Sequence, residues 1–210
     1  PYLGVLLSGV HSEFVLWNDH LSYEVIGETV DDAAGEALDK AARLLFSIGY
    51  PGGGFMERIA AEVGNVDEYK FTRPMLRSGD LNLSFSGLKT SLLYLHRSMS
   101  EAERVNRVKY MASSFQEAVF DTILRKLSKA IDQTGVNRLA VGGGVIANQY
   151  LRKKLRALAR KHGGEAVFPP YKYLTGDNAG MIGVVAAYRA EKNQFVTDLA
   201  TLDRLPRMHL

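Results

Sequence analysis

Three carboxylates with helical spacing are the first residues of this chain that could do chemistry. Asp32, Glu36 and Asp39 recur at i, i+4 and i+7 within the segment from Gly27 to Lys40, so a helix would place them on one face. Carboxylate oxygens on such a face accept hydrogen bonds from the hydroxyl groups of a ligand. An ordinary solvated polar face is the alternative interpretation, and the spacing alone leaves both open.

Two glycine-containing segments could bring backbone amides close to a ligand. The turn Ser8-Gly9-Val10 could hold a phosphate with its amides and hydroxyl, although it is equally an ordinary hairpin turn. A type II′ turn needs a positive φ only at Gly9 and would leave Val10 unstrained, whereas a turn with a positive φ at both residues would strain Val10. The triplet Gly142-Gly143-Gly144 lies between a predicted strand and a predicted helix, a geometry that suits nucleotide binding.

Two polar residues stand at the starts of predicted helices. Asn148 offers both a donor and an acceptor to a base or a sugar, and it could equally be a helix N-cap. Asp177 has the same N-cap interpretation. The chain has no cysteine, so any metal would have to be held by His, Asp or Glu. The five histidines show no i, i+4 pair, and none of them is taken as a ligand.

Hydrophobic periodicity predicts the elements that would position these residues. Strands are expected over residues 2–7, 13–17, 23–26, 138–141 and 166–168, and helices over 32–48, 55–63, 86–99, 105–133, 148–162 and 177–191. Thr29 and Asp32 predict a capping box for the first helix, and Gly49 predicts its end. Residues 64–83 read as a long irregular surface segment. Strands followed by alternating helices and strands favour an α/β fold.

Composition bounds the class of protein. With 210 residues, 46% of them hydrophobic and 23% charged, the chain can form one large domain, or one domain and part of another. Apolar runs are too short to span a membrane, and the first seven residues are too short for a signal peptide. Absence of cysteine fits a reducing cytoplasm. A net charge of +3 permits contact with nucleic acid.

A cluster of cations falls on the predicted helix 148–162. A solvated face is the usual interpretation of such a cluster, and neutralisation of nucleic-acid phosphates is the alternative. The cations are Arg152, Lys153, Lys154, Arg156, Arg160 and Lys161.

Five blocks along the chain, the last of them a pair, resemble the TsaD family of tRNA threonylcarbamoyltransferases, once described as O-sialoglycoprotein endopeptidases. The blocks are L-L-S-G-V-H-S at 6–12, G-E-T-V-D-D-A-A-G-E-A-L-D-K at 27–40, Y-P-G-G at 50–53, L-S-F-S-G-L-K-T at 83–90, and G-G-V-I-A-N at 143–148 with G-D-N-A-G-M-I at 176–182. Their order matches that of the family and covers nearly the whole chain.

The resemblance implies the second half of an actin/Hsp70-like (ASKHA, RNase H-like) ATPase core. Residues 1–192 would form its C-terminal lobe, with a helical insertion around 55–135, and residues 193–210 would form a tail. Family members begin with a phosphate-binding strand-loop unit and a helix carrying H-x-x-x-H. Neither is present here and the chain starts at Pro1 rather than Met. We therefore expect the C-terminal portion of a longer protein, inactive as an isolated fragment.

The resemblance also implies a reaction and its site. The family transfers a threonylcarbamoyl group from threonylcarbamoyl-AMP to N6 of adenosine 37 in tRNAs that read ANN codons. Asp177 would be one ligand of a single divalent metal, iron or zinc, whose two histidine ligands are expected upstream of Pro1. Val10 and Gly176 depart from the usual family residues. The residues implied to bind the nucleotide, ATP or threonylcarbamoyl-AMP, are Leu6, Leu7, Ser8, Gly9, Val10, Asp39, Gly53 and Asn148.

No catalytic residue is identified by motif, because the sequence has neither H-E-x-x-H nor a nucleophile elbow. Implied partners are tRNA and, in a bacterium, TsaB- and TsaE-like proteins, in a heterodimer or a homodimer in the cytoplasm and away from membranes. Two alternatives remain open. One is a non-catalytic actin/Hsp70-like paralogue that binds partners in the same pathway, and the other is a sugar- or acetate-type kinase of the superfamily.

Overall fold

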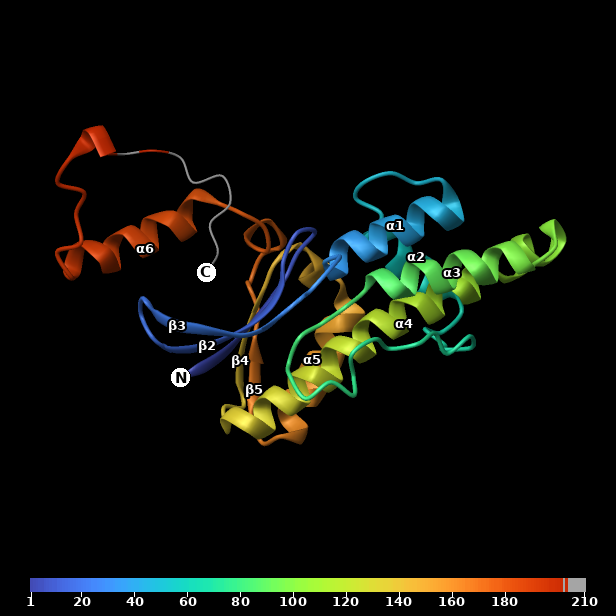
Figure 1. Cartoon of the computed structure of the whole chain (residues 1–210), viewed down its shortest axis with the longest axis horizontal. Coiled ribbons are helices and arrows are strands. Elements are labelled where there is room, and N and C mark those ends of the chain that lie inside the picture. Colours follow the sequence, from blue (N-terminus) through green and yellow to red (C-terminus); the bar gives the residue numbers. More distant parts are fainter. Residues whose placement is uncertain (202, 204–210) are drawn as a thin grey trace.

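A five-stranded mixed sheet forms the centre of the molecule in the computed structural model, which describes residues 1–201 and 203 (Figure 1). The strand order is β3-β2-β1-β4-β5, with antiparallel pairing from β1 to β3 and with β4 and β5 parallel to β1. The strands are β1 Tyr2–Leu7, β2 Ser12–Asp19, β3 Ser22–Glu28, β4 Arg138–Gly142 and β5 Glu165–Val167. All five predicted strands are therefore confirmed, with β2 and β3 longer than expected.

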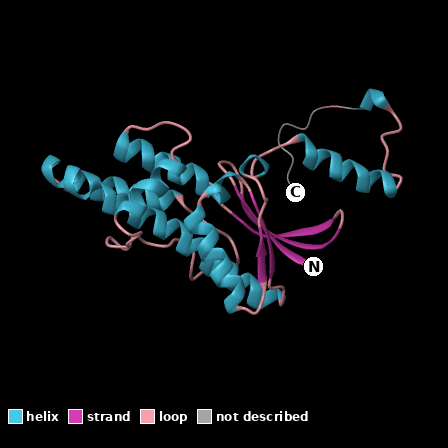
Figure 2. Ribbon diagram, turned by 180° about the vertical axis from the view of Figure 1, so that it is seen from behind, coloured by secondary structure: helices cyan, strands magenta, loops and turns pink. Residues whose placement is uncertain are grey.

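One face of the sheet carries the core. Leu3, Val5 and Leu7 alternate along β1 and are at most 1% exposed, as the period of a strand requires. Leu3 and Val5 are in register with Leu139 and Val141 of β4, which point to the same side. Helices α1 to α5 lie on this side of the sheet, and α6 lies on the other (Figures 1 and 2). The predicted α/β fold is confirmed.

The helical side is built around the 34-residue helix α4. The chain has α1 Ala34–Phe46, α2 Gly53–Glu62, α3 Ser86–Ser98, α4 Glu101–Thr134, α5 Gln149–Lys161 and α6 Ala179–Glu191, with short 3-10 helices at Gly144–Ala147, Lys172–Leu174 and Leu199–Thr201. Ser100 and Glu103 form a capping box at the start of α4, so this helix begins four residues before the predicted start. Residues 64–83 contain no helix or strand, as expected.

The start of α1 differs from the prediction. Its N-cap is Ala33, which has no side-chain cap, and the Thr29 hydroxyl donates to the Asp32 carbonyl instead of accepting from the helix. The orphan amide of Ala34 donates to Ser12 Oγ at 2.9 Å, on strand β2. The predicted capping box is therefore wrong, because the cap comes from a distant strand. The helix also ends at a left-handed Ser47, φ 56°, rather than at Gly49.

Two of the family-like blocks, far apart in sequence, pack against each other. Thr29 pairs with Leu83 in an isolated bridge, and Asp31 accepts from the amides of Phe85 (2.8 Å) and Ser86 (3.3 Å) at the start of α3. A Cβ on Gly27 would lie 2.6 Å from the Leu81 carbonyl oxygen, so only glycine allows this approach. These contacts fix the segment that leads into α1.

Helix α6 touches the rest of the described chain near the β2–β3 turn. His20 stacks on Tyr188 with ring centroids 3.6 Å apart, and Lys192 donates to the His20 carbonyl at 3.1 Å. None of the residues of α6 is buried. Across residues 1–201 and 203, every helix is too short or too polar to cross a membrane. Of the predicted tail, residues 202 and 204–210 lie outside the described residues.

Candidate functional site

The predicted site residues converge on two neighbouring cavities at the carboxyl ends of β1 and β4. The larger has a volume of about 820 Å³ and the smaller about 190 Å³. Leu6, Ser8, Gly9, Val10, Asp39 and Asp177 line the larger cavity, and Gly9, Asp39, Gly53 and Asn148 line the smaller. Gly9 and Asp39 line both, so we treat them as one site, called here the ligand cavity.

Leu7 is the exception among the predicted residues. Its side chain is fully buried in the core, because it follows Leu3 and Val5 on the helix-facing side of β1, and it lines neither cavity. Its contribution to this region is its backbone. A Cβ on Gly143 would lie 2.2 Å from the Leu7 carbonyl oxygen, so Leu7 sets how closely the glycine triplet approaches β1.

The hairpin turn is organised by Ser8. Its Oγ accepts from the amides of Val10 (3.1 Å) and His11 (2.8 Å), an arrangement in which a side chain replaces a backbone acceptor. Neither Gly9 nor Val10 has a positive φ, so the turn is neither of type II′ nor one with a positive φ at both residues. Val10 is consequently unstrained, and it is 74% exposed. Of the turn amides, that of Gly9 has no partner recorded among the described residues.

The turn is pressed against the first turn of α1. The Gly35 amide donates to the Ser8 carbonyl at 3.1 Å, and a Cβ on Gly35 would lie 2.6 Å from that oxygen. A glycine is therefore needed at position 35 for the helix to approach the hairpin. This contact, together with the Ser12 cap on Ala34, positions α1 at the cavity.

The three carboxylates with helical spacing, Asp32, Glu36 and Asp39, do not all lie on one helical face. Asp32 precedes α1, and both Asp32 (2.6 Å) and Glu36 (2.9 Å) pair with Lys40. The hydrogen bond that Lys40 donates to Asp32 is the main cause of the raised pKa of Lys40. The burial of Lys40 opposes this shift, and Glu36 raises the pKa further. Of the three, only Asp39 forms no ion pair within the described residues.

Asp39 anchors the loop at the start of α2. Its Oδ1 accepts from the amides of Gly52 (2.6 Å) and Gly53 (3.0 Å), two of the orphan donors of that helix. A Cβ on Gly52 would lie 2.5 Å from Ala42 Cβ, whereas Gly53 has open space. Gly52 is therefore required for packing, and Gly53 leaves room at the cavity wall. Asp39 Oδ2 has no partner recorded within residues 1–201 and 203.

Asn148 has both of its polar atoms engaged. Its Oδ1 caps α5 by accepting from the Leu151 amide at 2.8 Å, and its Nδ2 donates to Gln116 Oε1 at 3.1 Å. The side chain is 7% exposed. The N-cap interpretation of Asn148 is thus correct, and any ligand contact would use its second amide hydrogen or its second lone pair.

Asp177 lies at the entrance to α6 but does not cap it. Asn178 is the N-cap, accepting from the Met181 amide at 3.2 Å, so the cap interpretation of Asp177 is wrong. Among the described residues there is no group of three or more His, Cys, Asp or Glu that could hold a metal ion. Asp177 supplies at most one ligand, and the residues present do not form a metal site by themselves.

Sequence reasoning missed two cations that line the cavity, Lys40 and Arg43. Lys40 is paired as described. Arg43 is exposed, and its guanidinium has no partner among the described residues. Its spacing of four residues from Asp39 placed it near that face, but isolated arginines on helices are common, so the sequence carried no distinguishing signal.

The basic helix surface of α5 is partly used inside the protein. Lys154 pairs with Glu117, and the guanidinium groups of Arg152 and Arg156 lie 5.2 and 4.7 Å from the Phe168 ring centroid. Burial lowers the pKa of Lys154, but the hydrogen bonds that Lys154 donates to Glu117 and Tyr150 raise it, and the net shift is upward. The solvated cations that remain are Lys153, Arg160 and Lys161.

Comparison with known proteins gives a consistent relationship. Residues 1–184 match the sequence model of TsaD, tRNA N6-adenosine threonylcarbamoyltransferase. Proteins of that name from Thermosipho africanus and Kosmotoga olearia are 41% and 44% identical, and the alignments cover 100% and 93% of this chain. They cover 62% and 57% of the relatives. The chain therefore spans somewhat more than half the length of the curated relatives it matches.

A solved structure supports the same fold at lower similarity. The crystal structure of T. kodakarensis HypF superimposes with a TM-score of 0.57 at 19% identity, over 83% of this chain and 21% of that protein. At this identity the match concerns the fold alone.

Proposed function

The chain belongs to the tRNA N6-adenosine threonylcarbamoyltransferase family, with its actin/Hsp70-like fold, and we propose that the protein it is part of transfers the threonylcarbamoyl group of threonylcarbamoyl-AMP to N6 of adenosine 37 of tRNA. The observation that carries this proposal is the single cavity shared by the hairpin turn, Asp39, the glycine triplet and Asp177. Five blocks of sequence that resemble the family meet there or support it.

The reaction needs positioning more than it needs a nucleophilic side chain. The N6 amine attacks the carbonyl carbon, the bond from that carbon to the phosphate oxygen breaks, and AMP leaves with the electron pair while N6 loses a proton. Holding the two substrates in line accounts for much of such a rate enhancement. The chain needs to hold the adenylate, orient its carbonyl and stabilise the leaving phosphate.

We assign these tasks to residues of the ligand cavity. Asp39 Oδ2 would accept from a ribose hydroxyl, and the Gly9 amide with Arg43 would hold the phosphate. Gly53 and Gly144 leave room for the nucleotide, because a Cβ added at either glycine would meet no atom within 4 Å. Asn148 would touch the base or sugar with its remaining hydrogen-bonding capacity. No step is assigned to a metal.

The family relationship also supports finer proposals. Asp177 would be one of the ligands of a divalent metal, iron or zinc, completed by two histidines from the part of the protein that precedes this chain. The tRNA substrate would place the protein in the cytoplasm, and in a bacterium its partners would be TsaB- and TsaE-like proteins, as a heterodimer or a homodimer.

Asp177→Asn in the intact protein tests the function and the metal assignment together. Because Asn178 is the N-cap, this substitution does not touch the cap, and folding should stay intact. We expect lower metal content and loss of the modified adenosine from tRNA of cells that carry only the variant. The matched control is Asp198→Asn, an exposed aspartate outside the cavity. Wild-type metal content and modification in the Asp177 variant would remove Asp177 from the site.

A further inference from the structure

A separate cavity of about 540 Å³ lies on the helical side of the molecule, between α4 and the irregular segment before α3. Five of the residues that line it are cationic and none is acidic. They are Arg73, Arg77, Arg125, Lys126 and Lys129. We call it the basic cavity, and none of its lining residues lines the ligand cavity.

Two of these cations build the wall. The Lys126 side chain is 1% exposed, and its ammonium donates to Ser78 Oγ (2.7 Å), the Asp80 carbonyl (3.0 Å) and Asp80 Oδ1 (3.2 Å). Lys129 donates to the carbonyls of Gly79 (2.6 Å), Ser78 (3.2 Å) and Asp80 (3.2 Å). An ammonium has three donors, so both lysines hold the segment to α4 and neither keeps a free hydrogen for a ligand.

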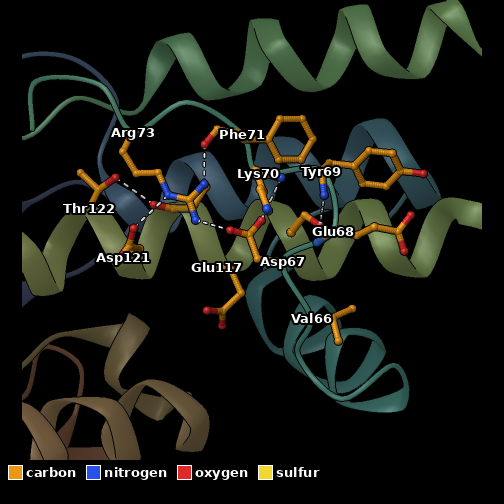
Figure 3. A network of polar contacts seen from close by, with 12 residues as sticks. Val66, Asp67, Glu68, Tyr69, Lys70, Phe71, Arg73, Glu117, Asp121 and Thr122 are labelled. Atoms are coloured by element: carbon orange, nitrogen blue, oxygen red, sulfur yellow. Dashed lines mark hydrogen bonds and ion pairs between the residues drawn. The ribbon is translucent and has the colours of Figure 1, made fainter.

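Arg73 is committed in the same way (Figure 3). Its Nε donates to Asp121 Oδ2 at 3.0 Å, its Nη2 to Asp67 Oδ2 at 2.5 Å and its Nη1 to the Phe71 carbonyl at 2.5 Å. The other oxygen of Asp121 accepts from Arg125 Nε at 2.9 Å. Of the acids next to the cavity, Asp67 and Asp121 are therefore paired with arginines and Asp80 is paired with Lys126, and none of the three lines the cavity.

Two guanidinium groups keep unused donors at the cavity. Arg77 is exposed and has no recorded partner among residues 1–201 and 203. The Arg125 side chain is 66% exposed and uses only Nε, which donates to Asp121. Both of its Nη groups have no hydrogen-bond partner among the described residues. Planar guanidinium forks match the oxygens of a phosphoryl group. The charge of Lys129, which contacts only carbonyl oxygens, adds to the field, whereas the Asp80 carboxylate offsets that of Lys126.

We propose that the basic cavity binds phosphoryl groups of a polynucleotide backbone through Arg77 and Arg125. No aromatic side chain of the described residues lines it, so it lacks the stacking surface that a base would need. The inference rests on the proposed function, because the polynucleotide is then the tRNA substrate, and it assigns this chain a contact surface away from the reacting adenosine.

Cations also lie at the end of α5, beside α4. His162 Nε2 lies 2.9 Å from Ser128 Oγ, so the last turn of α5 lies beside the stretch of α4 that carries Lys129. Arg160 and Lys161 occupy that turn and are exposed. Asp132 of α4 places a carboxylate at the same junction, with its Oδ1 3.4 Å from His162 Nδ1, so the proposed contact surface is limited to the basic cavity.

The test is tRNA binding by the intact protein over a series of salt concentrations. The double variant Arg77→Ala/Arg125→Ala should bind unmodified tRNA about tenfold more weakly. The slope of log K against log salt should also shrink in magnitude by about one to two, because binding releases fewer counterions when two phosphate contacts are lost. Arg77→Lys/Arg125→Lys keeps the charge and loses the forks, so it should keep most of the slope and lose part of the affinity.

Arg58→Ala/Arg97→Ala removes two arginines outside the basic cavity and should leave affinity and slope unchanged. If the wild-type protein neither binds nor modifies tRNA, the proposed function fails. If the wild type does both and the Arg77/Arg125 alanine variant binds as it does, with the same slope, the basic cavity proposal is overturned. If the Arg77/Arg125 alanine variant lost ATP affinity but bound tRNA as the wild type does, the proposal would also be overturned, and the occupant of the basic cavity would be a free nucleotide.

Discussion

At the residue scale, Asp39 combines two roles in one carboxylate. Oδ1 holds the amides of Gly52 and Gly53, and Oδ2 faces no recorded partner in the described residues. The first oxygen orders the loop at the start of α2, and the second is available to a ligand in the cavity that Asp39 lines. Different substitutions at Asp39 should therefore change stability and ligand affinity to different extents.

Substitutions at Asp39 should separate these roles. Asp39→Asn keeps an acceptor oxygen for the loop and removes the charge, so thermal stability should stay near wild type while adenine-nucleotide affinity falls by about 1.5–3 kcal/mol, the range for a hydrogen bond to a charged group. Asp39→Ala should lose both affinity and stability. Calorimetric titration with ATP on the intact protein measures the affinity. An asparagine variant with wild-type affinity would leave Asp39 with the loop role only.

The glycine triplet gives a second residue-scale prediction. Gly143 has φ +94°, and a Cβ there would lie 2.2 Å from the Leu7 carbonyl oxygen, whereas Gly142 and Gly144 have open space and no positive φ. Gly143→Ala should therefore cost roughly 3 kcal/mol or more of unfolding free energy through clash and strain. Gly142→Ala and Gly144→Ala are the controls and should cost less than about 1 kcal/mol. Denaturant unfolding measures all three, and equal costs would contradict the approach of the triplet to β1.

At the element scale, the sequence predicted the strands and most helices because their apolar periods are local. The start of α1 was not predicted correctly, because its first amide is capped by Ser12 of strand β2. A pattern in the sequence near α1 does not contain that contact. The cavity lining was predicted for residues inside the family-like blocks. Arg77 was missed because residues 64–83 have no apolar period. Arg125 was missed because it is one of several cations on the long helix α4, and the cavity that both residues line forms only in the folded chain.

The attachment of the segment 73–80 to α4 should depend on pH. The hydrogen bond from Ser78, and then that from Lys126, lowers the pKa of Asp80, while burial opposes this shift. A lowered pKa in the folded state means that the attachment is complete above the ordinary pKa of an aspartate and is lost as the pH falls through the folded value. We expect the Asn82 amide, which donates to Asp80 Oδ1 at 3.1 Å, to exchange faster below about pH 4, once exchange is corrected for its intrinsic pH dependence.

Lys126→Met tests the cause of this attachment. The methionine fills the space of the buried stem and removes the ammonium, so the variant should lose about 1–3 kcal/mol at neutral pH and show a weaker pH dependence of exchange at Asn82. Lys109→Met, at an exposed ion pair with Glu62, is the control and should change stability by less than about 1 kcal/mol. The same pH dependence in Lys126→Met and wild type would assign the attachment to Ser78 alone.

At the scale of the whole molecule, the sheet separates a tightly packed helical side from α6. Leu151, Leu155 and Ala159 of α5 are fully buried, whereas Ile182 and Val184 of α6 are 70% and 57% exposed. A helix that is apolar on most of its surface is usually buried. Because Asp177 stands at the entrance of α6, the few contacts of this helix also govern how firmly Asp177 is held at the ligand cavity.

The two helices should therefore contribute unequally to the stability of the chain of residues 1–210. Leu155→Ala removes a fully buried side chain and should cost about 2–5 kcal/mol of unfolding free energy, whereas Ile182→Ala in α6 should cost less than about 0.5 kcal/mol. Denaturant unfolding of both variants measures this difference. The same pair made in the longer protein shows whether α6 gains contacts there, since a large cost for Ile182→Ala only in the longer protein would mean that the preceding part covers it. A large cost in residues 1–210 themselves would contradict the exposed position of α6.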